Sequence, residues 1–429
     1  MIPELLAPAG SFACAEAAFA HGADAVYAGI GRFNLRAHSP NFSVREFGEL
    51  VDFAVDMRKR VYGVLNIMPD DQLLDSLEDT LKEMAEYGKL PGAFIISDPG
   101  VLSSVKKIFA DMPLHLSTQS GCFNSASMQF WKNQGVSRVI LPRELNLEQI
   151  RRLSALNVAE TEVFVHGAMC VSVSGRCLLG AYLNGRHPNL GDCPQPCRFK
   201  YRIVPNEQGV DFTCDGFDVE ESWAESAGEG DSAKFRLPDN GVYLLNSKDL
   251  RTIEILPALV ESGAAAFKIE GRNKSAHYVA SAVKVYRDAI DTYVGGPQDY
   301  RVKGWWAEEL EAVEHRPYTT GFYAAEPVKQ ELFASKARAG CRLVGTVKAV
   351  INGLPVVDVK NGFSAAEPVN VLPVKNSQPP FELKFGKITE LDGTECAKAR
   401  PNRLAVLNGC SEKLRVGDML REVIVAAPA

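Results

Sequence analysis

The chain has 429 residues, of which 46% are hydrophobic and 23% charged, and its formal net charge is −6. This composition is that of a globular protein, and the length exceeds one ordinary hydrophobic core, so we expect two domains. The first residues, MIPELLAPAG, lack a basic segment and a long apolar core, and no apolar run approaches a membrane span. Together with ten cysteines, these features predict a protein of the reducing cytoplasm with no membrane partner.

Short apolar runs alternate with amphipathic segments over the first three hundred residues. The expected strands are Leu5–Ala7, Ala25–Ala28, Val61–Leu65, Ala93–Ile96, Leu114–Ser117, Arg138–Leu141, Val163–Val165 and Ala265–Ile269. The expected helices include Val44–Lys59, Asp71–Tyr87, Ser125–Gln134, Leu147–Leu156 and Ala276–Tyr293. Eight units of a strand followed by a helix predict an α/β fold, a TIM-type (β/α)8 barrel. A doubly wound open sheet is the main alternative, but no GxGxxG motif follows the first strand.

Polar residues follow nearly every expected strand. They are Asn66, Asp98, Thr118, Gln119, Arg143, Glu144, His166, Glu270 and Arg272. In a barrel of this type the active site lies at the carboxyl ends of the strands, so these side chains are candidates for one shared site. Polar residues are also common at strand ends because they meet solvent there. His166 could transfer a proton near neutral pH or serve as a structural hydrogen-bonding group.

A loop after the second expected strand contains Asn34 and Arg36 and is long enough to fold over the same face. The planar guanidinium of Arg36 matches a carboxylate, and Arg143 and Arg272 have the same capacity. A surface ion pair is the alternative for each of these arginines.

Four cysteines lie between Glu162 and Arg198. Cys170, Cys177, Cys193 and Cys197 are separated by six, fifteen and three residues. Glycines throughout this stretch allow the tight turns of a chain that wraps around a small inorganic group. Four thiolates at variable spacing are typical of iron–sulfur clusters, whereas zinc knuckles use paired short spacings that only the last pair approaches. The spacing leaves three options open: an iron–sulfur cluster, a zinc site, or buried free thiols.

The barrel is interrupted by an insertion at about 168–250. Within it, Glu207–Ala233 carries nine acidic residues and no Lys or Arg, and Cys214 in this segment is a poor ligand candidate. Near its end, Asp249 is expected to cap a helix over Leu250–Glu261.

The predicted domains are a barrel over 1–300, a linker over 301–339 and a small antiparallel β-barrel over 340–429. The last segment consists of short β-branched runs separated by turns, which is typical of such a barrel.

Several motifs resemble those of a known family. EVFVHGAMCVSVSGRC resembles the signature of the collagenase-like peptidase family U32, and so do ELLAPAG, DAVYAGIGRFNLRA, LLNSKDL and FKIEGR. HRPYTTGF at 315–322 resembles the branch of prephenate-dependent tRNA uridine 5-hydroxylases, and Cys197 supplies the fourth thiol as in that branch. The resemblance extends from residue 1 to near residue 325.

This resemblance implies an enzyme that hydroxylates C5 of the wobble uridine in the anticodon loop of tRNA, with the base splayed out of the loop. It implies a 4Fe–4S cluster and prephenate, a dicarboxylate, as the hydroxyl source. The expected cluster ligands are Cys170, Cys177, Cys193 and Cys197. The expected catalytic residues are His166, Glu270 and Asp98. The expected substrate-binding residues are Asn34, Arg36, Asn66, Gln119, Arg143 and Arg272.

Three alternatives remain at this point. A U32-type peptidase would need an activated nucleophile, and a pair of His166 and Cys170 would remove one cluster ligand. A related hydroxylase could act on rRNA or on a quinone precursor. A non-catalytic scaffold would use the cluster only to brace its loop.

Overall fold

The computed structural model describes residues 2–37, 41–201, 242–324 and 339–424. The acidic segment Glu207–Ala233, with Cys214, lies outside the described residues. Among the described helices, none combines the length and the apolar character that crossing a bilayer requires.

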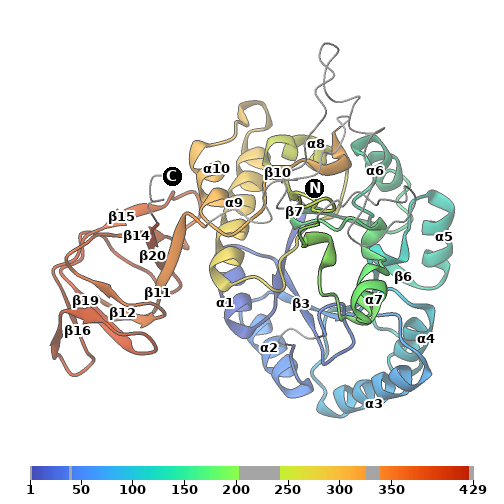
Figure 1. Ribbon diagram of the computed structural model, residues 1–429, viewed down its shortest axis with the longest axis horizontal. Helices are drawn as coiled ribbons and strands as arrows, with labels where there is room; N and C mark the ends of the chain where they lie inside the picture. Colours follow the sequence, from blue (N-terminus) through green and yellow to red (C-terminus); the bar gives the residue numbers. More distant parts are fainter. Residues whose placement is uncertain (1, 38–40, 202–241, 325–338, 425–429) are drawn as a thin grey trace, which may run out of the picture.

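Eight parallel strands close into a barrel (Figure 1). The strands are β1 (Glu4–Ala9), β2 (Ala25–Gly29), β3 (Arg60–Leu65), β4 (Ala93–Ile96), β5 (Leu114–Leu116), β6 (Val136–Ile140), β7 (Glu160–Ala168) and β9 (Ala266–Ile269). Each strand pairs with the next, and β9 closes the ring by pairing with both β7 and β1. The predicted TIM-type barrel is therefore confirmed.

Helices surround this barrel. They are α1 (Phe12–Ala20), α2 (Val44–Asp56), α3 (Asp71–Tyr87), α4 (Pro99–Ile108), α5 (Ser125–Asn133), α6 (Leu147–Ser154), α8 (Leu256–Glu261) and α9 (Ala276–Gly295). Several of these helices start at a polar capping residue: Ser43 forms a capping box with Glu46, and Asn146 forms one with Gln149. Because such caps satisfy the first free N–H groups, the local sequence fixes where these helices start.

The insertion after β7 covers the carboxyl end of the barrel. It contains η2 (Val173–Gly175), α7 (Leu179–Asn184), η3 (Pro188–Leu190), η4 (Pro196–Arg198) and β8 (Asp249–Arg251). It lies close to the loop after β2, because a Cβ atom on Gly191 would come within 2.4 Å of the Asn34 carbonyl oxygen. The loop after β3 is also fastened to it, through the N–H of Met68 and the carbonyl of Asn189 (3.2 Å).

The structure corrects one helix prediction in this region. Leu250 belongs to β8, which pairs antiparallel with β7 and parallel with β10 (Tyr318–Thr319), so the helix starts only at Leu256. Asp249 caps no helix there, because its carboxylate binds Arg316 instead.

The chain then passes through α10 (Gly304–Glu311) into an antiparallel sheet, as predicted for this part of the sequence. Its eight strands are β11 (Cys341–Ile351), β12 (Leu354–Val359), β14 (Val369–Leu372), β15 (Phe381–Leu383), β16 (Lys387–Thr389), β17 (Glu395–Cys396), β19 (Leu404–Asn408) and β20 (Met419–Val423), and β13 (Phe363–Ser364) pairs separately with β18 (Lys398–Ala399). Figure 1 shows this sheet beside the barrel, on the side of α1, α9 and α10.

Polar and apolar contacts join the sheet to the barrel. Arg421 of β20 forms a buried ion pair with Glu309 of α10 (2.5 Å), and Lys284 of α9 donates to the carbonyl of Lys375 (2.8 Å). A small apolar cluster completes the contact and contains Ala17, Ala280, Leu372 and Met419.

Candidate functional site

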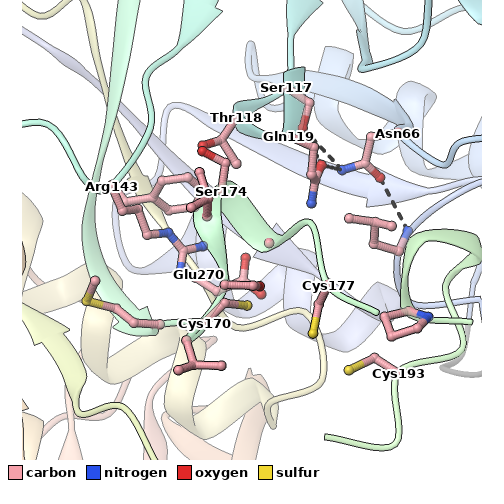
Figure 2. Close-up of a pocket in the computed structure, with 18 of the residues that line it drawn as sticks. Asn66, Ser117, Thr118, Gln119, Arg143, Cys170, Ser174, Cys177, Cys193 and Glu270 are labelled. Atoms are coloured by element: carbon pink, nitrogen blue, oxygen red, sulfur yellow. Dashed lines mark hydrogen bonds between the residues drawn. The ribbon is translucent and has the colours of Figure 1, made fainter. Parts of the chain in front are cut away.

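A cavity of about 330 Å³ lies at the carboxyl ends of the barrel strands, next to the insertion. Cys170, Cys177, Cys193 and Cys197 all line it. Figure 2 shows the first three of them. Of the residues predicted to act in catalysis or to bind substrate, six line it too: Arg36, Asn66, Gln119, Arg143, Glu270 and Arg272. Tyr27, Ser117, Glu144, Lys248 and Lys268 also contribute to its wall. The cavity falls within the usual size range of small-molecule sites, which begins near ~300 Å³.

The four thiols are close enough to influence one another. Burial raises the pKa of Cys197 to about 11, and the neighbouring Cys170 adds to this effect. The pKa of Cys193 is raised for the same two reasons, against the opposing charge of Arg36. Among the described residues, no three His, Cys, Asp or Glu side chains meet as ligands of a single metal ion. The four thiols border one shared cavity.

A buried clamp holds the backbone just before Cys170. Arg316, which follows α10, pairs with Asp249 (2.6 Å) and donates to the carbonyl of Met169 (3.4 Å). Ser247 donates to the same carbonyl (2.6 Å). Arg316 and Asp249 both have side chains only 4% exposed, so the charge of each is balanced by the other away from water. The LLNSKDL and HRPYTTGF motifs thus act together to position the first cysteine.

The opposite turn of the cysteine loop is held by Glu144. Its carboxylate accepts the N–H of Ser174 (2.6 Å) and the Ser174 hydroxyl (3.3 Å). Ser174 adopts a left-handed conformation with φ +49°, which costs a non-glycine residue free energy and persists because these contacts hold it. The loop between Cys170 and Cys177 is therefore held at its start and near its middle.

Glu270 lies at the centre of a charged group on the wall. Its carboxylate accepts the Tyr27 hydroxyl (3.0 Å) and pairs with Arg36 (3.3 Å). Burial alone would raise the pKa of Glu270, but the charges of Arg36, Arg143 and Arg272 outweigh it and lower that pKa. Glu270 is consequently a carboxylate at neutral pH and an acceptor of hydrogen bonds.

Asn34 holds Arg272 by accepting a hydrogen bond from its Nη2 (2.6 Å). Its other terminal nitrogen, Nη1, is buried and has no hydrogen-bond partner among the described residues. Burial, and next to it the charge of Arg36, lower the pKa of Arg272 to about 10. Asn34 itself is fully buried and does not line the cavity, so its observed part is to position Arg272.

The side chain of Arg143, which follows β6, contacts the neighbouring strand β7. It donates to the carbonyl of Ala168, and its guanidinium lies over the Phe164 ring at 3.9 Å. None of the ion pairs in the described part of the chain includes Arg143, Lys248 or Arg272. The wall therefore offers cations that could bind an anionic ligand.

Amide and hydroxyl groups form another part of the wall. Asn66 donates to Gln119 Oε1 (2.8 Å), and the hydroxyl of Ser117 donates to the same oxygen (2.7 Å). Figure 2 shows the nitrogen of Gln119 turned away from these two residues, into the space that faces the cysteines.

Two predicted catalytic residues lie elsewhere. His166 is buried outside the cavity lining, against the rings of Tyr278, Tyr286 and Tyr318, and burial lowers its pKa to about 3. Asp98 caps α4 by accepting the N–H groups of Gly100 and Val101. In the folded chain, His166 is thus a packing residue and Asp98 is a helix cap.

Sequence reasoning did not select Lys268, Tyr27 or Arg316. Lys268 pairs with the buried Glu162 (2.8 Å) below the cavity. It lies two residues before Glu270 and on the same side of the strand, because side chains alternate along β9. This two-residue alternation is the sequence signal that could have identified Lys268 as a neighbour of Glu270. Arg316 lies inside HRPYTTGF, a motif that indicates a family branch but gives no role to its arginine.

Comparison with known proteins agrees with this architecture. The model of the family described as Peptidase family U32 matches residues 10–332. The chain is 37% identical to tRNA hydroxylation protein P of Escherichia coli, over 86% of either chain. It is 34% identical to tRNA hydroxylation protein P1 of Bacillus subtilis, over 78% of this chain and 74% of that one. It is also 31% identical to the 23S rRNA 5-hydroxycytidine C2501 synthase of Escherichia coli, over 86% of this chain and 52% of the other. The protein with this cysteine-lined barrel belongs to peptidase family U32.

Proposed function

We propose that this protein is a hydroxylase that modifies tRNA, adding a hydroxyl group to C5 of the wobble uridine. The names of its relatives support hydroxylation of RNA as the reaction class. The observation that carries the proposal is the meeting of four cysteines with a cationic and amide-bearing wall in one cavity. A nucleobase reaches such a cavity only when it is turned out of its stack, as bases in anticodon loops can be.

We further propose that Cys170, Cys177, Cys193 and Cys197 hold a 4Fe–4S cluster. In such a cluster each thiolate binds a different iron, so the four sulfurs surround a body wider than one ion. Four cysteines on the wall of one cavity provide the four thiolates that such a cluster requires. When bound, the cluster would supply electron transfer. The raised pKa of Cys193 and that of Cys197 mean that metal binding must displace their protons.

Prephenate is the proposed hydroxyl source. Its two carboxylates require cations, and Arg143, Lys248 and Arg272 provide them in the lining of the cavity. Arg36 is already paired with Glu270, so its part is to hold that carboxylate in place. A polar, charged lining suits a dicarboxylate and a nucleobase better than a lipid-like quinone precursor.

Proteolysis has less support. A thiol protease needs a base within hydrogen-bonding reach of its nucleophile. No histidine is among the described residues that line the cavity, and His166 is packed between tyrosines.

The decisive experiment is purification without oxygen, followed by an absorbance spectrum and iron and sulfide assays. We expect a broad band near roughly 400 nm that Cys170→Ser removes. Cys410→Ser is the matched control, since Cys410 is a half-buried thiol in the C-terminal sheet domain. In an Escherichia coli strain that lacks its related protein, wild type should restore 5-hydroxyuridine derivatives in digested tRNA, and Cys170→Ser should not. A colourless protein under these conditions, or unmodified tRNA, would contradict the proposal.

A further inference from the structure

The amide group of Gln119 has only one orientation that satisfies its neighbours. A backbone N–H is always a donor, and that of Leu35 points at Asn66 Oδ1 (3.3 Å). The Nδ2 group of Asn66 must then face the other way, where it donates to Gln119 Oε1 (2.8 Å). The Ser117 hydroxyl accepts a hydrogen bond from Asn66 (3.3 Å) and donates one to the same Gln119 oxygen (2.7 Å).

This relay fixes the polarity of the cavity wall. With two donors on its oxygen, Gln119 turns its NH2 group away from Asn66 and Ser117. That nitrogen lies near Gly175 of the cysteine loop, since a Cβ atom on Gly175 would stand 3.3 Å from it. Gln119 therefore presents hydrogen-bond donors, and no acceptor, to the space in front of the cysteines.

We propose that this amide donates to O4 of the target uracil and thereby selects uridine over cytidine. The inference rests on the proposed function and assigns a specificity-determining residue within it. Uracil carries a carbonyl oxygen on C4, where cytosine carries an amino group that is itself a donor. C4 is bonded to C5, so a donor that holds O4 also holds C5 close to the cysteine side of the cavity. A cytosine in the same position would bring two donors together and leave both unpaired.

The neutral character of this wall favours a base over the dicarboxylate. Carboxylates bind most strongly to charged donors, and the unpaired cations Arg143 and Arg272 come from other loops. The side chains hydrogen-bonded to Gln119 are an amide, Asn66, and a hydroxyl, Ser117. Neutral donors of this kind match the carbonyl groups of a nucleobase.

Two variants reverse the polarity without changing the shape. Gln119→Glu keeps an oxygen for Asn66 and Ser117 and turns a second oxygen, an acceptor, toward the base. Asn66→Asp can no longer donate, so Gln119 must rotate its NH2 group toward Asp and its carbonyl toward the cavity. The measurement is the initial rate of hydroxylation by holoenzyme of two tRNA transcripts that differ only in U or C at the wobble position, by mass spectrometry of the digested RNA.

Wild type should convert uridine at least about 100-fold faster than cytidine, and each variant should lower this ratio at least about 100-fold. Gln134→Glu, the same exchange at an exposed position of the barrel surface, should leave the ratio unchanged. Retention of the absorbance band and of the melting temperature identifies folded variants, and Asn66→Asp decides the matter if Gln119→Glu does not fold.

Two results would overturn the inference in different ways. If both folded variants keep the wild-type ratio while the KM for prephenate rises, Gln119 serves the dicarboxylate, and the hydroxylase proposal stands. If wild type converts neither base although prephenate is supplied and the cluster is present, the hydroxylase proposal itself fails, and this inference fails with it.

Discussion

The guanidinium of Arg272 contains a buried hydrogen-bond donor that has no acceptor among the described residues. It is 8% exposed, yet Nη1 has no partner among the described residues, and Asn34 satisfies only the other side of the group. Gly29 makes this arrangement possible, because a Cβ atom there would lie 2.5 Å from Nη1. A buried donor of this kind costs free energy until a ligand accepts from it.

We therefore expect Arg272→Gln to weaken prephenate binding to the purified protein by about 10- to 100-fold, since a hydrogen bond to a charged group contributes about 1.5–3 kcal/mol. Calorimetric titration without RNA measures this directly. Arg32→Gln, at an exposed arginine of the loop after β2, should bind as wild type does. Equal affinities for wild type and Arg272→Gln would remove Arg272 from the binding site.

At the scale of elements, the cysteine loop depends on a clamp assembled from distant segments. Arg316 fastens β8 and the backbone before Cys170 through Asp249 and Met169. Arg316→Met should lower the free energy of unfolding by about 3 kcal/mol, because it leaves a buried carboxylate without its partner. Arg342→Met, which breaks an ion pair whose side chains are 49% and 44% exposed, should cost less than about 1 kcal/mol. Urea titrations of the two variants compare the losses, and similar losses would mean that the clamp adds no stability.

The same clamp illustrates which features of the fold can be predicted from the sequence and which cannot. Buried strands and capped helices are local features, so the barrel and the strand-end residues Asn66 and Gln119 could be predicted. The partner of Asp249 lies 67 positions further along the chain, and no local pattern reveals it. His166 was placed at a strand end, but β7 continues to Ala168, so this side chain points into the packed tyrosines. The polarity of Gln119 depends on three loops meeting and is likewise a property of the fold.

At the scale of the whole molecule, four histidines of the described part of the chain are buried in places that disfavour their charged form. Burial is the main cause in each case, and it lowers the pKa of His21 to about 4 and that of His115, His166 and His277 to about 3. His277 also faces Arg421 at the junction of barrel and sheet (3.2 Å). A neutral imidazole therefore forms part of the contact between the barrel and the sheet.

This burial predicts a loss of stability when the pH falls from 7 to 5. The unfolded chain takes up protons at its histidines below about pH 6.5, whereas the folded chain does not until near pH 4 or 3, so protonation favours unfolding throughout this window. One such histidine contributes about 2 kcal/mol to the difference between pH 7 and pH 5. His166→Phe keeps the packing against the tyrosines and should reduce the pH-dependent loss by about that amount, whatever its effect at pH 7. His187→Gln, at an exposed position, should leave the loss unchanged. Urea denaturation at the two pH values measures it, and an equal loss in wild type and His166→Phe would show that this imidazole does not stay neutral in the folded protein.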